Sequence, residues 1–408
     1  MVRVFDMQRL YSKQITTELF QNRQMLFVSG PRQVGKTTLA KQLCQEHNGH
    51  YLNWDDVDHR QLILAGTNAL VSTFGLDQLH TQKPLIIFDE LHKYRHWKDF
   101  LKGFYDRYEQ QLHILVTGSA RLDIFKKGGD SLMGRYFHLH MHPLTIREVS
   151  AQPIDSEQLL QSPQSITADN FTQLYQFGGF PEPFIKANPR FSLRWHTLRS
   201  KQLIQEDIRD ASNVQELAQL EVLSRLLSAQ AGQVTRYATL ATQIRVSVDT
   251  IRRWLDTLES FYFCFRIRPW SANIASSLRK EPKTYLWDWS LIDDSGMRAE
   301  NFVASHLLKA VHWWNDLGMG DFGLYYLRTK DQKEVDFLVS KNGSPWFLVE
   351  VKSSDSAGIN PNLAWFQNKT GAEHAFQVCM NMPFVAADCF SVKTPIKVPA
   401  QTFLSQLV

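Results

Sequence analysis

One short segment constrains this chain more than any other part of its 408 residues. Residues 30–37 read Gly-Pro-Arg-Gln-Val-Gly-Lys-Thr, which fits the phosphate-loop pattern G-x-x-x-x-G-K-[ST] at every position. A short apolar run, 24–29, precedes the segment, and a stretch with helical spacing begins at Thr38. A strand, a glycine-rich turn and a helix in this order point backbone N–H groups and a helix N-terminus at a phosphate. The sequence therefore predicts a nucleoside triphosphate site.

Two side chains of this segment have specific predicted roles. Lys36 is expected to reach the β- and γ-phosphates of ATP, and the Thr37 hydroxyl is expected to hold Mg²⁺. Together with one residue from further along the chain, the predicted nucleotide-binding set is Gly30, Pro31, Arg32, Gln33, Val34, Gly35, Lys36, Thr37, Thr38 and Ser119.

Strand-like apolar runs alternate with helical stretches through the first 150 residues. This alternation predicts a parallel sheet covered by helices on both faces, with ligands at the carboxyl ends of the strands. The expected strands are 25–29, 51–54, 85–88, 113–117 and 136–141.

Polar residues follow two of these runs. Asp89 and Glu90 come directly after the third run, so Asp89 is expected in the Mg²⁺ shell and Glu90 is expected to orient and activate the attacking water. The alternative is a buried strand followed by a solvated acidic turn. At the end of the fourth run, Ser119 is the first choice for a group that senses the γ-phosphate, and Thr117 is the second.

The fifth run offers two further candidates. Arg135 precedes it and is a candidate to neutralise transition-state charge, in its own chain or in a neighbouring subunit. A surface salt bridge is the alternative role for Arg135. His138, His140 and His142 alternate, so a strand would place them on one face. An exposed polar strand face is a more economical interpretation than a metal site, because no fourth ligand is apparent.

Taken together, these residues resemble those of AAA+ type P-loop ATPases. A closer resemblance is to a prokaryotic family that joins such an ATPase to a C-terminal domain of uncertain function. The segments that carry this resemblance are 30–37, 89–90, 117–119, 143–148 and 178–181.

The middle of the chain has a helix-turn-helix pattern. Residues 237–259 read as helix, short turn and helix with Ser247 as the N-cap, and 262–268 alternate like a wing strand. From 245 to 283, eight Lys/Arg stand against four Asp/Glu, which favours a phosphate-facing surface. In a winged helix the second helix enters the major groove. A structural lid or protein-contact module is the alternative. The candidate DNA-binding residues are Ser247, Thr250, Arg252 and Arg253.

A second group of chemistry-bearing residues lies near the C-terminus. Glu300 is in an amphipathic helix, Asp336 is in a strand, and Glu350 and Lys352 lie two apart on the next strand. A hairpin at 341–345 would bring Asp336 beside Glu350. Clustered carboxylates bind Mg²⁺ through oxygen ligands, and a lysine beside them can polarise water or steady phosphate charge.

This group resembles the active site of the PD-(D/E)xK nuclease superfamily. The resemblance implies that Glu300, Asp336 and Glu350 lie near the metal, with Asp336 and Glu350 as its ligands, and that Lys352 is the catalytic lysine. Val335 stands where many members have proline. The alternative is an inherited nuclease-like scaffold that binds DNA or a partner without cutting.

Composition adds only broad limits. A net charge of +4 permits a nucleic-acid partner but does not demand one. No apolar run approaches the ~18 residues of a membrane-spanning helix, and the N-terminus lacks the apolar core of a signal peptide. The four cysteines lack C-x-x-C spacing and suit free thiols in a reducing cytoplasm, where we expect the protein to be.

We therefore expect an α/β chain in four parts. They are an AAA+ ATPase domain (1–150), a linker and helical connector (151–215), a winged helix-turn-helix (216–275) and an α/β restriction-endonuclease-like domain (276–408). The expected function is ATP hydrolysis coupled to remodelling or processing DNA, branched DNA included, by a self-associating protein that uses ATP and Mg²⁺. The alternative is a nucleotide-controlled switch that binds a protein or promoter DNA and carries an inactive nuclease-like scaffold.

Overall fold

The computed structural model describes residues 9–76, 78, 82–119, 132–211, 214–271, 281–356 and 358–408. The chain divides into two compact units, Met1–His142 and Pro143–Val408, which are described separately below. The last three of the four expected parts therefore fall within one compact unit, and the four-part organisation stays a prediction. Residues 1–6, in which no signal peptide was expected, lie outside the described residues.

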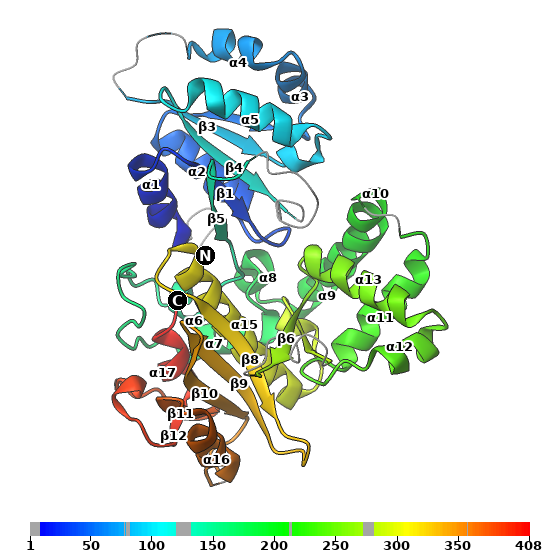
Figure 1. The fold of residues 1–408 in the computed structure, drawn as a ribbon, viewed down its shortest axis with the longest axis vertical. Helices are drawn as coiled ribbons and strands as arrows, with labels where there is room; N and C mark the ends of the chain where they lie inside the picture. The colour runs from blue at the N-terminus through cyan, green and yellow to red at the C-terminus, as the bar shows by residue number, and fades with distance from the viewer. Residues whose placement is uncertain are drawn as a thin grey trace. The chain divides into compact units, whose positions relative to one another are not determined.

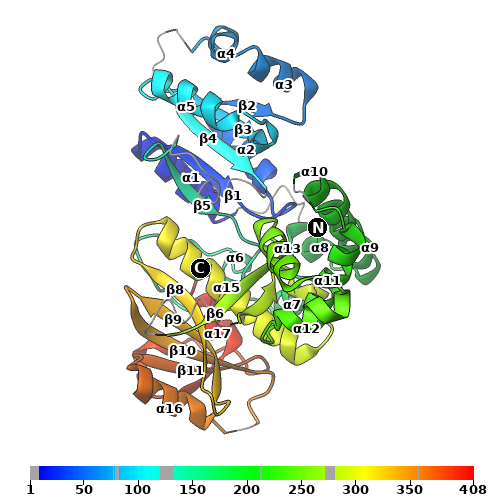
Figure 2. The same cartoon turned by 45° about the vertical axis from the view of Figure 1, so that its right-hand side comes forward.

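The N-terminal unit is built on a five-stranded sheet, as the alternating runs predicted. All neighbouring strands are parallel, in the order β2-β3-β4-β1-β5 (Figures 1 and 2). Its elements are α1 (Tyr11–Gln21), β1 (Met25–Ser29), α2 (Lys36–Glu46), β2 (His50–Asn53), α3 (Val57–Leu64), α4 (Thr67–Phe74), β3 (Leu85–Asp89), η2 (Leu91–Lys93), α5 (Trp97–Tyr108), β4 (His113–Gly118) and β5 (Tyr136–His140).

Helices cover both faces of this sheet. On one face, α1 and α2 contact β1, β3 and β4. On the other, α5 buries a stripe at helical spacing, and the rings of Phe100 and Phe104 meet Phe88 of β3 edge to face at 5.7 and 5.8 Å. Each fully buried aromatic of this kind stabilises the fold by roughly 1.5–3 kcal/mol. All five residues of β1 and of β3 are buried, which explains why the first four residues of each strand are apolar.

The strand order sets the place of the site. Because β4 lies between β1 and β3, the carboxyl ends of these three strands adjoin. In register, Thr117 of β4 pairs with Val28 of β1 on one side and with Asp89 of β3 on the other. The polar residues that follow the three strands are thereby gathered at one edge of the sheet.

The C-terminal unit begins with a helical region. Among the described residues, seven helices precede a helix-turn-helix and a pair of strands. Figure 2 shows this helical region in green. The elements are α6 (Ile146–Val149), α7 (Ala168–Phe177), α8 (Pro181–Lys186), α9 (Pro189–Gln202), the π-helix η4 (Leu203–Ile208), α10 (Arg209–Ala211), α11 (Leu217–Ala229), α12 (Tyr237–Ile244), α13 (Val248–Ser260), β6 (Cys264–Pro269) and β7 (Lys283–Leu286).

The second half of this unit contains a seven-stranded mixed sheet. The strand order is β12-β11-β10-β9-β8-β6-β7, so the strands after the helix-turn-helix extend the same sheet. The remaining elements are η5 (Trp289–Leu291), α15 (Ser295–Asp316), β8 (Phe322–Arg328), β9 (Glu334–Lys341), β10 (Ser344–Lys352), α16 (Pro361–Thr370), β11 (His374–Cys379), η6 (Cys389–Ser391), β12 (Ile396–Pro399) and α17 (Ala400–Ser405).

Helices pack on both faces of the mixed sheet. Leu348 of β10 belongs to the apolar cluster that includes Phe366 of α16, whereas its neighbour Phe347 contacts the ring of Phe403 on α17. Successive side chains of a strand point to opposite faces, so α16 and α17 cover different faces. The hairpin expected between β9 and β10 is present, with Asn342 and Gly343 both at positive φ, as a tight two-residue turn requires.

The helix-turn-helix forms as the sequence predicted. The hydroxyl of Ser247 accepts a hydrogen bond from the Thr250 N–H at 3.0 Å and caps α13. Arg245 ends α12 in the left-handed conformation, which turns the chain. Four buried side chains pack α13 into the unit: Ile251, Trp254, Leu255 and Leu258. The strand that follows, β6, pairs antiparallel with β7 and parallel with β8.

Two of the family landmarks have structural roles in the C-terminal unit. In 143–148, the buried Glu148 carboxylate accepts a hydrogen bond from Lys309 of α15 at 2.6 Å. In 178–181, a Cβ on Gly178 would lie 2.7 Å from Asp288 Oδ1, and the residue has φ 82°. Segment 143–148 therefore contacts α15, and segment 178–181 packs against Asp288. Segment 143–148 lies beyond the N-terminal unit, which ends at His142.

The first part of the expected linker and connector, residues 151–167, contains no helix or strand. It is nevertheless fixed, because the Gln161 N–H donates to the Gln406 carbonyl and the Gln164 N–H donates to Ser405 Oγ. The four cysteine thiols are free. Among the described helices, none is long and apolar enough to cross a membrane.

Candidate nucleotide site and a second carboxylate cluster

The phosphate loop leaves β1 and enters α2, as predicted. Gly30 follows β1 and lies so close to Met141, the residue after β5, that an added Cβ would be 2.2 Å from the Met141 carbonyl oxygen. Gly35 is the N-cap of α2 with φ 105°, a conformation that favours glycine. Both glycines of the motif are thus required by the backbone path.

Lys36 lies inside the loop. Lys36 is 6% exposed, and its amino group donates to the carbonyls of Gly30 at 2.8 Å and Pro31 at 2.7 Å. Among the other predicted loop residues, Val34 is buried, Arg32 and Thr38 are half-buried and Gln33 is exposed. A lysine buried within a loop of backbone groups is positioned for a phosphate.

Arg9 supports this loop through hydrogen bonds, and sequence reasoning did not predict that role. The buried Arg9 guanidinium donates to the carbonyls of Val34 at 2.5 Å and His142 at 2.6 Å. It thereby links the phosphate loop to His142, two residues beyond the end of β5. No motif marks Arg9, because its partners are 25 and 133 positions away.

Asp89 accepts hydrogen bonds from three hydroxyl groups. Thr37 donates at 2.7 Å, Tyr51 at 2.6 Å and Thr117 at 2.5 Å. The two predicted Mg²⁺ ligands, Thr37 and Asp89, are therefore in direct contact. A hydroxyl and a carboxylate are hard oxygen ligands, so this pair fits Mg²⁺.

Tyr51 of β2 is a second residue that sequence reasoning missed. Burial and the Asp89 charge raise the pKa of the Tyr51 phenol well above its usual value. The phenol therefore stays protonated and donates to Asp89 throughout the physiological range. It occupies the strand that neighbours β3, which no local pattern around the phosphate loop reveals.

Glu90 has the surroundings of an ionised base. Burial acts to raise the pKa of its carboxyl group, but nearby His92, Lys36 and Lys93 outweigh burial and lower it. Glu90 Oε2 lies 3.4 Å from Ser119 Oγ, 3.5 Å from Lys93 Nζ and 3.7 Å from His92 Nε2. Ser119 is buried directly after β4, so the proposed sensor and the proposed base are in contact.

The surroundings of Arg135 match the alternative role considered for it. Its guanidinium forms a two-point pair with the Asp106 carboxylate of α5, at 2.6 and 3.1 Å. This pair is partly exposed. The role of Arg135 in neutralising transition-state charge stays a prediction.

The prediction that the alternating histidines form an exposed strand face is wrong. His142 is buried, and His138 is half-buried with its Nε2 2.7 Å from Ser29 Oγ. Burial, reinforced by His140, lowers the pKa of His138 to about 3, so the ring stays neutral. In the described part of the chain, no group of three or more His, Cys, Asp or Glu residues is arranged to hold a metal ion.

The predicted nuclease-like residues come together in the C-terminal unit. Glu350 Oε1 accepts from Lys352 Nζ and from Asn360 Nδ2, each at 2.7 Å. Asp336 Oδ2 accepts from the Val351 N–H at 2.8 Å. Burial, together with the charges of Glu300 and Glu350, raises the pKa of Asp336 well above its usual value. The sequence therefore predicted a real cluster from three separate elements.

A lysine that sequence reasoning assigned elsewhere lies within this cluster. Lys283 Nζ is 2.7 Å from Glu334, 3.0 Å from Glu300 and 3.9 Å from Asp336. The cluster borders a cavity of about 650 Å³ that is lined by residues 230–236, α12, α15 and the strands β7, β8 and β9. With an ammonium group among the carboxylates, the residues as arranged do not fit a divalent metal.

The basic surface near α13 is smaller than the sequence count suggested. Arg266 is paired with Asp256 and Glu259, and Lys283 is buried in the carboxylate cluster. Arg279 and Lys280 lie outside the described residues. Of the candidate DNA-binding residues, Ser247, Arg252 and Arg253 are exposed and Thr250 is half-buried.

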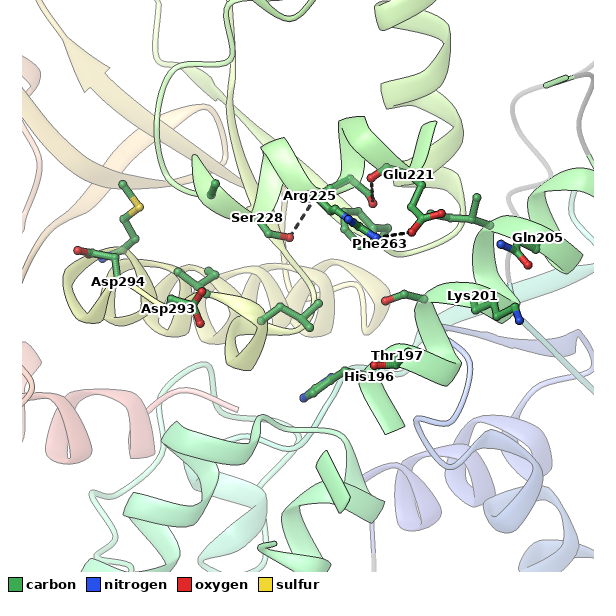
Figure 3. Close-up of a pocket in the computed structure, with 17 residues that line it drawn as sticks. His196, Thr197, Lys201, Gln205, Glu221, Arg225, Ser228, Phe263, Asp293 and Asp294 are labelled. Atoms are coloured by element: carbon green, nitrogen blue, oxygen red, sulfur yellow. Dashed lines mark hydrogen bonds and ion pairs between the residues drawn. The ribbon is translucent and has the colours of Figure 1, made fainter. Parts of the chain in front are cut away.

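A further cavity of about 660 Å³ lies between α9, α11 and residues 291–297 (Figure 3). Acidic and basic side chains both line this cavity, and Arg225 forms an ion pair with Glu221 at 2.7 Å. Lys201 from α9 and Asp293 and Asp294 from the opposite wall also line it. None of the sequence-predicted site residues lines this cavity.

The comparison with protein-family models agrees with the site. An AAA domain model matches residues 22–150. Two models described as domains of unknown function, DUF8612 and DUF4143, match 168–295 and 295–393. With the parallel sheet and the phosphate loop, the first match defines an AAA-type P-loop ATPase domain, which supports binding and hydrolysis of ATP.

Relatives of this chain extend beyond the ATPase domain. Uncharacterised proteins of Mycobacterium tuberculosis and Mycobacterium bovis are each 25% identical over 355 residues, covering 83% of this chain and 72% of theirs. An uncharacterised protein of Methanocaldococcus jannaschii is 24% identical over 330 residues, covering 70% and 68%.

Solved structures give weaker similarity. The Walker-type ATPase of Pyrococcus abyssi is 13% identical, with a TM-score of 0.45 over 71% of this chain and 98% of that one. The RuvB Holliday junction branch migration motor of Thermotoga maritima is 15% identical, with a TM-score of 0.32 over 64% and 90%. TM-scores this low establish no shared fold over the whole chain.

Proposed function

We propose that this chain is an ATP-hydrolysing protein that binds DNA and remodels or processes it, branched DNA included. The observation that carries the hydrolytic part is the convergence at the carboxyl edge of the sheet. Thr37 contacts Asp89 there, and Glu90 lies beside Ser119. These are the groups that a site for attack of water on a γ-phosphate requires.

Each residue of this site has a distinct task in the proposal. Lys36 and the loop N–H groups bind the phosphates, and Thr37 and Asp89 hold Mg²⁺, which neutralises charge on the phosphate oxygens when bound. Glu90, ionised because His92, Lys36 and Lys93 offset its burial, orients water and accepts its proton. Ser119 contacts the γ-phosphate and holds Glu90.

The DNA part of the proposal is supported by α13. A capped helix that follows a short turn presents Arg252 and Arg253 to solvent near its N-terminus. In a winged helix this is the region that enters the major groove. The strand pair β6–β7 follows α13, where a wing would be.

The proposal is tested by measuring ATP hydrolysis with and without duplex, forked and junction DNA. We expect at least one DNA form to raise the rate, and we expect Lys36→Ala to abolish hydrolysis with and without DNA. An unchanged rate with every DNA form, together with no salt-sensitive DNA binding, would rule out the DNA part and leave the ATPase intact.

A charge-removal experiment locates the DNA surface. Replacing Arg252 and Arg253 by Ala removes two phosphate contacts in the proposal, so the slope of log affinity against log salt should fall by about 2. Arg225→Ala on α11 is the matched control, because its side chain is 77% exposed in the same unit. An equal change in the control would show that α13 has no special role.

A second candidate function is a nucleotide-controlled switch that binds a protein or promoter DNA, with a nuclease-like scaffold that does not cut. The position of Lys283 among the carboxylates favours a scaffold without cleavage. Mg²⁺- or Mn²⁺-dependent cutting by the purified protein that is lost in Glu350→Ala would contradict this candidate and restore Glu300, Asp336, Glu350 and Lys352 as a nuclease site.

Self-association is part of the first proposal, because Arg135 acting on a neighbouring subunit requires a second copy. The pairing of Arg135 with Asp106 would have to break for that role. Sizing the protein with ATP-γ-S, with and without branched DNA, tests this assembly. A monomer under all conditions would restrict Arg135 to its own chain. A cytoplasmic location remains a prediction from the free thiols.

A further inference from the structure

We infer that Lys283 is the resident cation of the C-terminal carboxylate cluster and keeps divalent metal out of it. The cluster joins three carboxylates from two elements, Glu300 of α15 and Glu334 and Asp336 of β9. The Lys283 ammonium lies within 4 Å of all three. A cation that is part of the chain is present at an effective concentration that a dissolved ion cannot match.

Lys283 is held in this position by the fold. It is 3% exposed, and it pairs with Ile267 of β6 across the antiparallel strand pair. On its other side, Val234 forms an isolated bridge with Lys283, and the Thr235 N–H donates to the Pro282 carbonyl. The backbone on both sides therefore fixes where the side chain starts.

The carboxylate oxygens have protein donors as well. Glu300 Oε1 accepts from the Tyr285 hydroxyl at 2.6 Å in addition to Lys283. Tyr285 lies two residues beyond Lys283 on β7, so both donors point from the same face of that strand. Asp336 Oδ2 is engaged by the Val351 N–H, and Glu350 Oε1 by Lys352 and Asn360.

The coordination geometry of Mg²⁺ and the charge of Lys283 both argue against a metal in this cluster. Mg²⁺ requires near-octahedral oxygen ligands at about 2.0–2.1 Å, which an ammonium group lying among the same oxygens prevents. Burying an ammonium group is costly unless carboxylates surround it, so Lys283 and the carboxylates stabilise each other. The chain itself therefore balances part of the negative charge of the cluster, and a metal would have to displace Lys283.

Mn²⁺ binding measured by electron paramagnetic resonance tests this inference without reference to ATP or DNA. All proteins carry Asp89→Asn, so that the ATP site contributes no metal, and nucleotide and DNA are left out. With Lys283 intact we expect no bound Mn²⁺. Lys283→Met should create one Mn²⁺ site per chain, which Asp336→Asn should remove again. Lys283→Arg, which keeps the charge, is the matched control and should bind none.

Two results would overturn the inference. One is bound Mn²⁺ with Lys283 intact that Asp336→Asn abolishes; the other is a folded Lys283→Met variant that binds none. If Lys283→Met does not fold, the double variant Lys283→Met/Glu334→Gln removes one charge of each sign and keeps Glu300, Asp336 and Glu350. It should then bind Mn²⁺, and failure of this folded variant to do so would equally refute the inference.

Discussion

The nucleotide site and the C-terminal cluster each combine carboxylates with a buried lysine, and they differ in what the lysine contacts. At the phosphate loop, Lys36 donates to backbone carbonyls, and Asp89 is approached by neutral hydroxyls. In the C-terminal cluster, Lys283 lies directly among the carboxylates. Within the described part of the chain, no ion pair of Asp89 with a Lys, Arg or His side chain is present.

This difference decides which site can take a metal. Hydroxyls around a carboxylate leave its negative charge unneutralised, so a divalent cation still gains from binding there. An ammonium group among the carboxylates reduces that gain and occupies the space that the metal would need. The presence of acidic residues with a nearby lysine is thus insufficient to identify a metal site, because the position of the lysine relative to the carboxylates determines the outcome.

The sharpest test of the phosphate-loop side of this comparison is Glu90→Gln. The change keeps shape but removes the charged base, so ATP hydrolysis should fall by about 10²–10⁴-fold. ATP binding should persist, because Lys36 and the loop backbone are untouched. Steady-state hydrolysis and equilibrium binding of a fluorescent ATP analogue measure the two effects. A fall of less than tenfold would mean that Glu90 is a structural acid in a solvated turn.

The C-terminal side is tested by stability. Lys283→Met leaves Glu300, Glu334 and Asp336 without their shared cation, so the free energy of unfolding of that unit should fall by about 3 kcal/mol. Lys36→Met should cost less, because the acceptors described for its amino group are two neutral loop carbonyls, at about 1 kcal/mol each. Urea unfolding of the full chain, followed in each unit, provides the comparison.

Equal losses for the two lysine variants would contradict the proposed difference between the sites. A matched surface control is Lys201→Met on α9, whose loss should change stability by less than about 0.5 kcal/mol.

The sequence predicted the local parts of both sites and missed the residues that arrive from a distance. The phosphate loop, the Asp89–Glu90 pair and the α13 cap are contiguous patterns, and each is present in the structure. Five strand runs predicted a parallel sheet, and its core is the apolar cluster around Phe27 and Phe88. Nothing local reveals the strand order, because it is set by packing between separated segments.

The missed residues share this non-local character. Arg9, Tyr51 and Lys283 each reach the site from a part of the chain with no chemical motif. Lys283 was counted with a basic, phosphate-facing surface because it follows a helix-turn-helix in a lysine- and arginine-rich stretch. Only the pairing of β7 with β6 shows that it points into the acidic cluster. Composition counts charges but does not tell which face of a strand carries them.

The smallest expected effect concerns the pH dependence of hydrolysis. Burial opposes ionisation of Glu90, but His92, Lys36 and Lys93 prevail and lower its pKa below the usual value of about 4.3. The ionised base is present above that pKa, and activity that depends on it is lost only as pH falls through it. Glu90 should therefore cause no loss of rate between about pH 8 and 5.

Lys93→Met removes a positive charge 3.5 Å from Glu90, so the pKa of Glu90 should rise and the acidic limb of the rate profile should move to higher pH. Because Lys93 is partly exposed, solvent screening should limit this shift to less than about one pH unit. Lys102→Met on the exposed side of α5 is the control and should leave the limb in place. An acidic limb that stays fixed in Lys93→Met would show that Glu90 is not the group whose ionisation controls the rate, and the contrast between the two carboxylate sites would then rest on Asp89 alone.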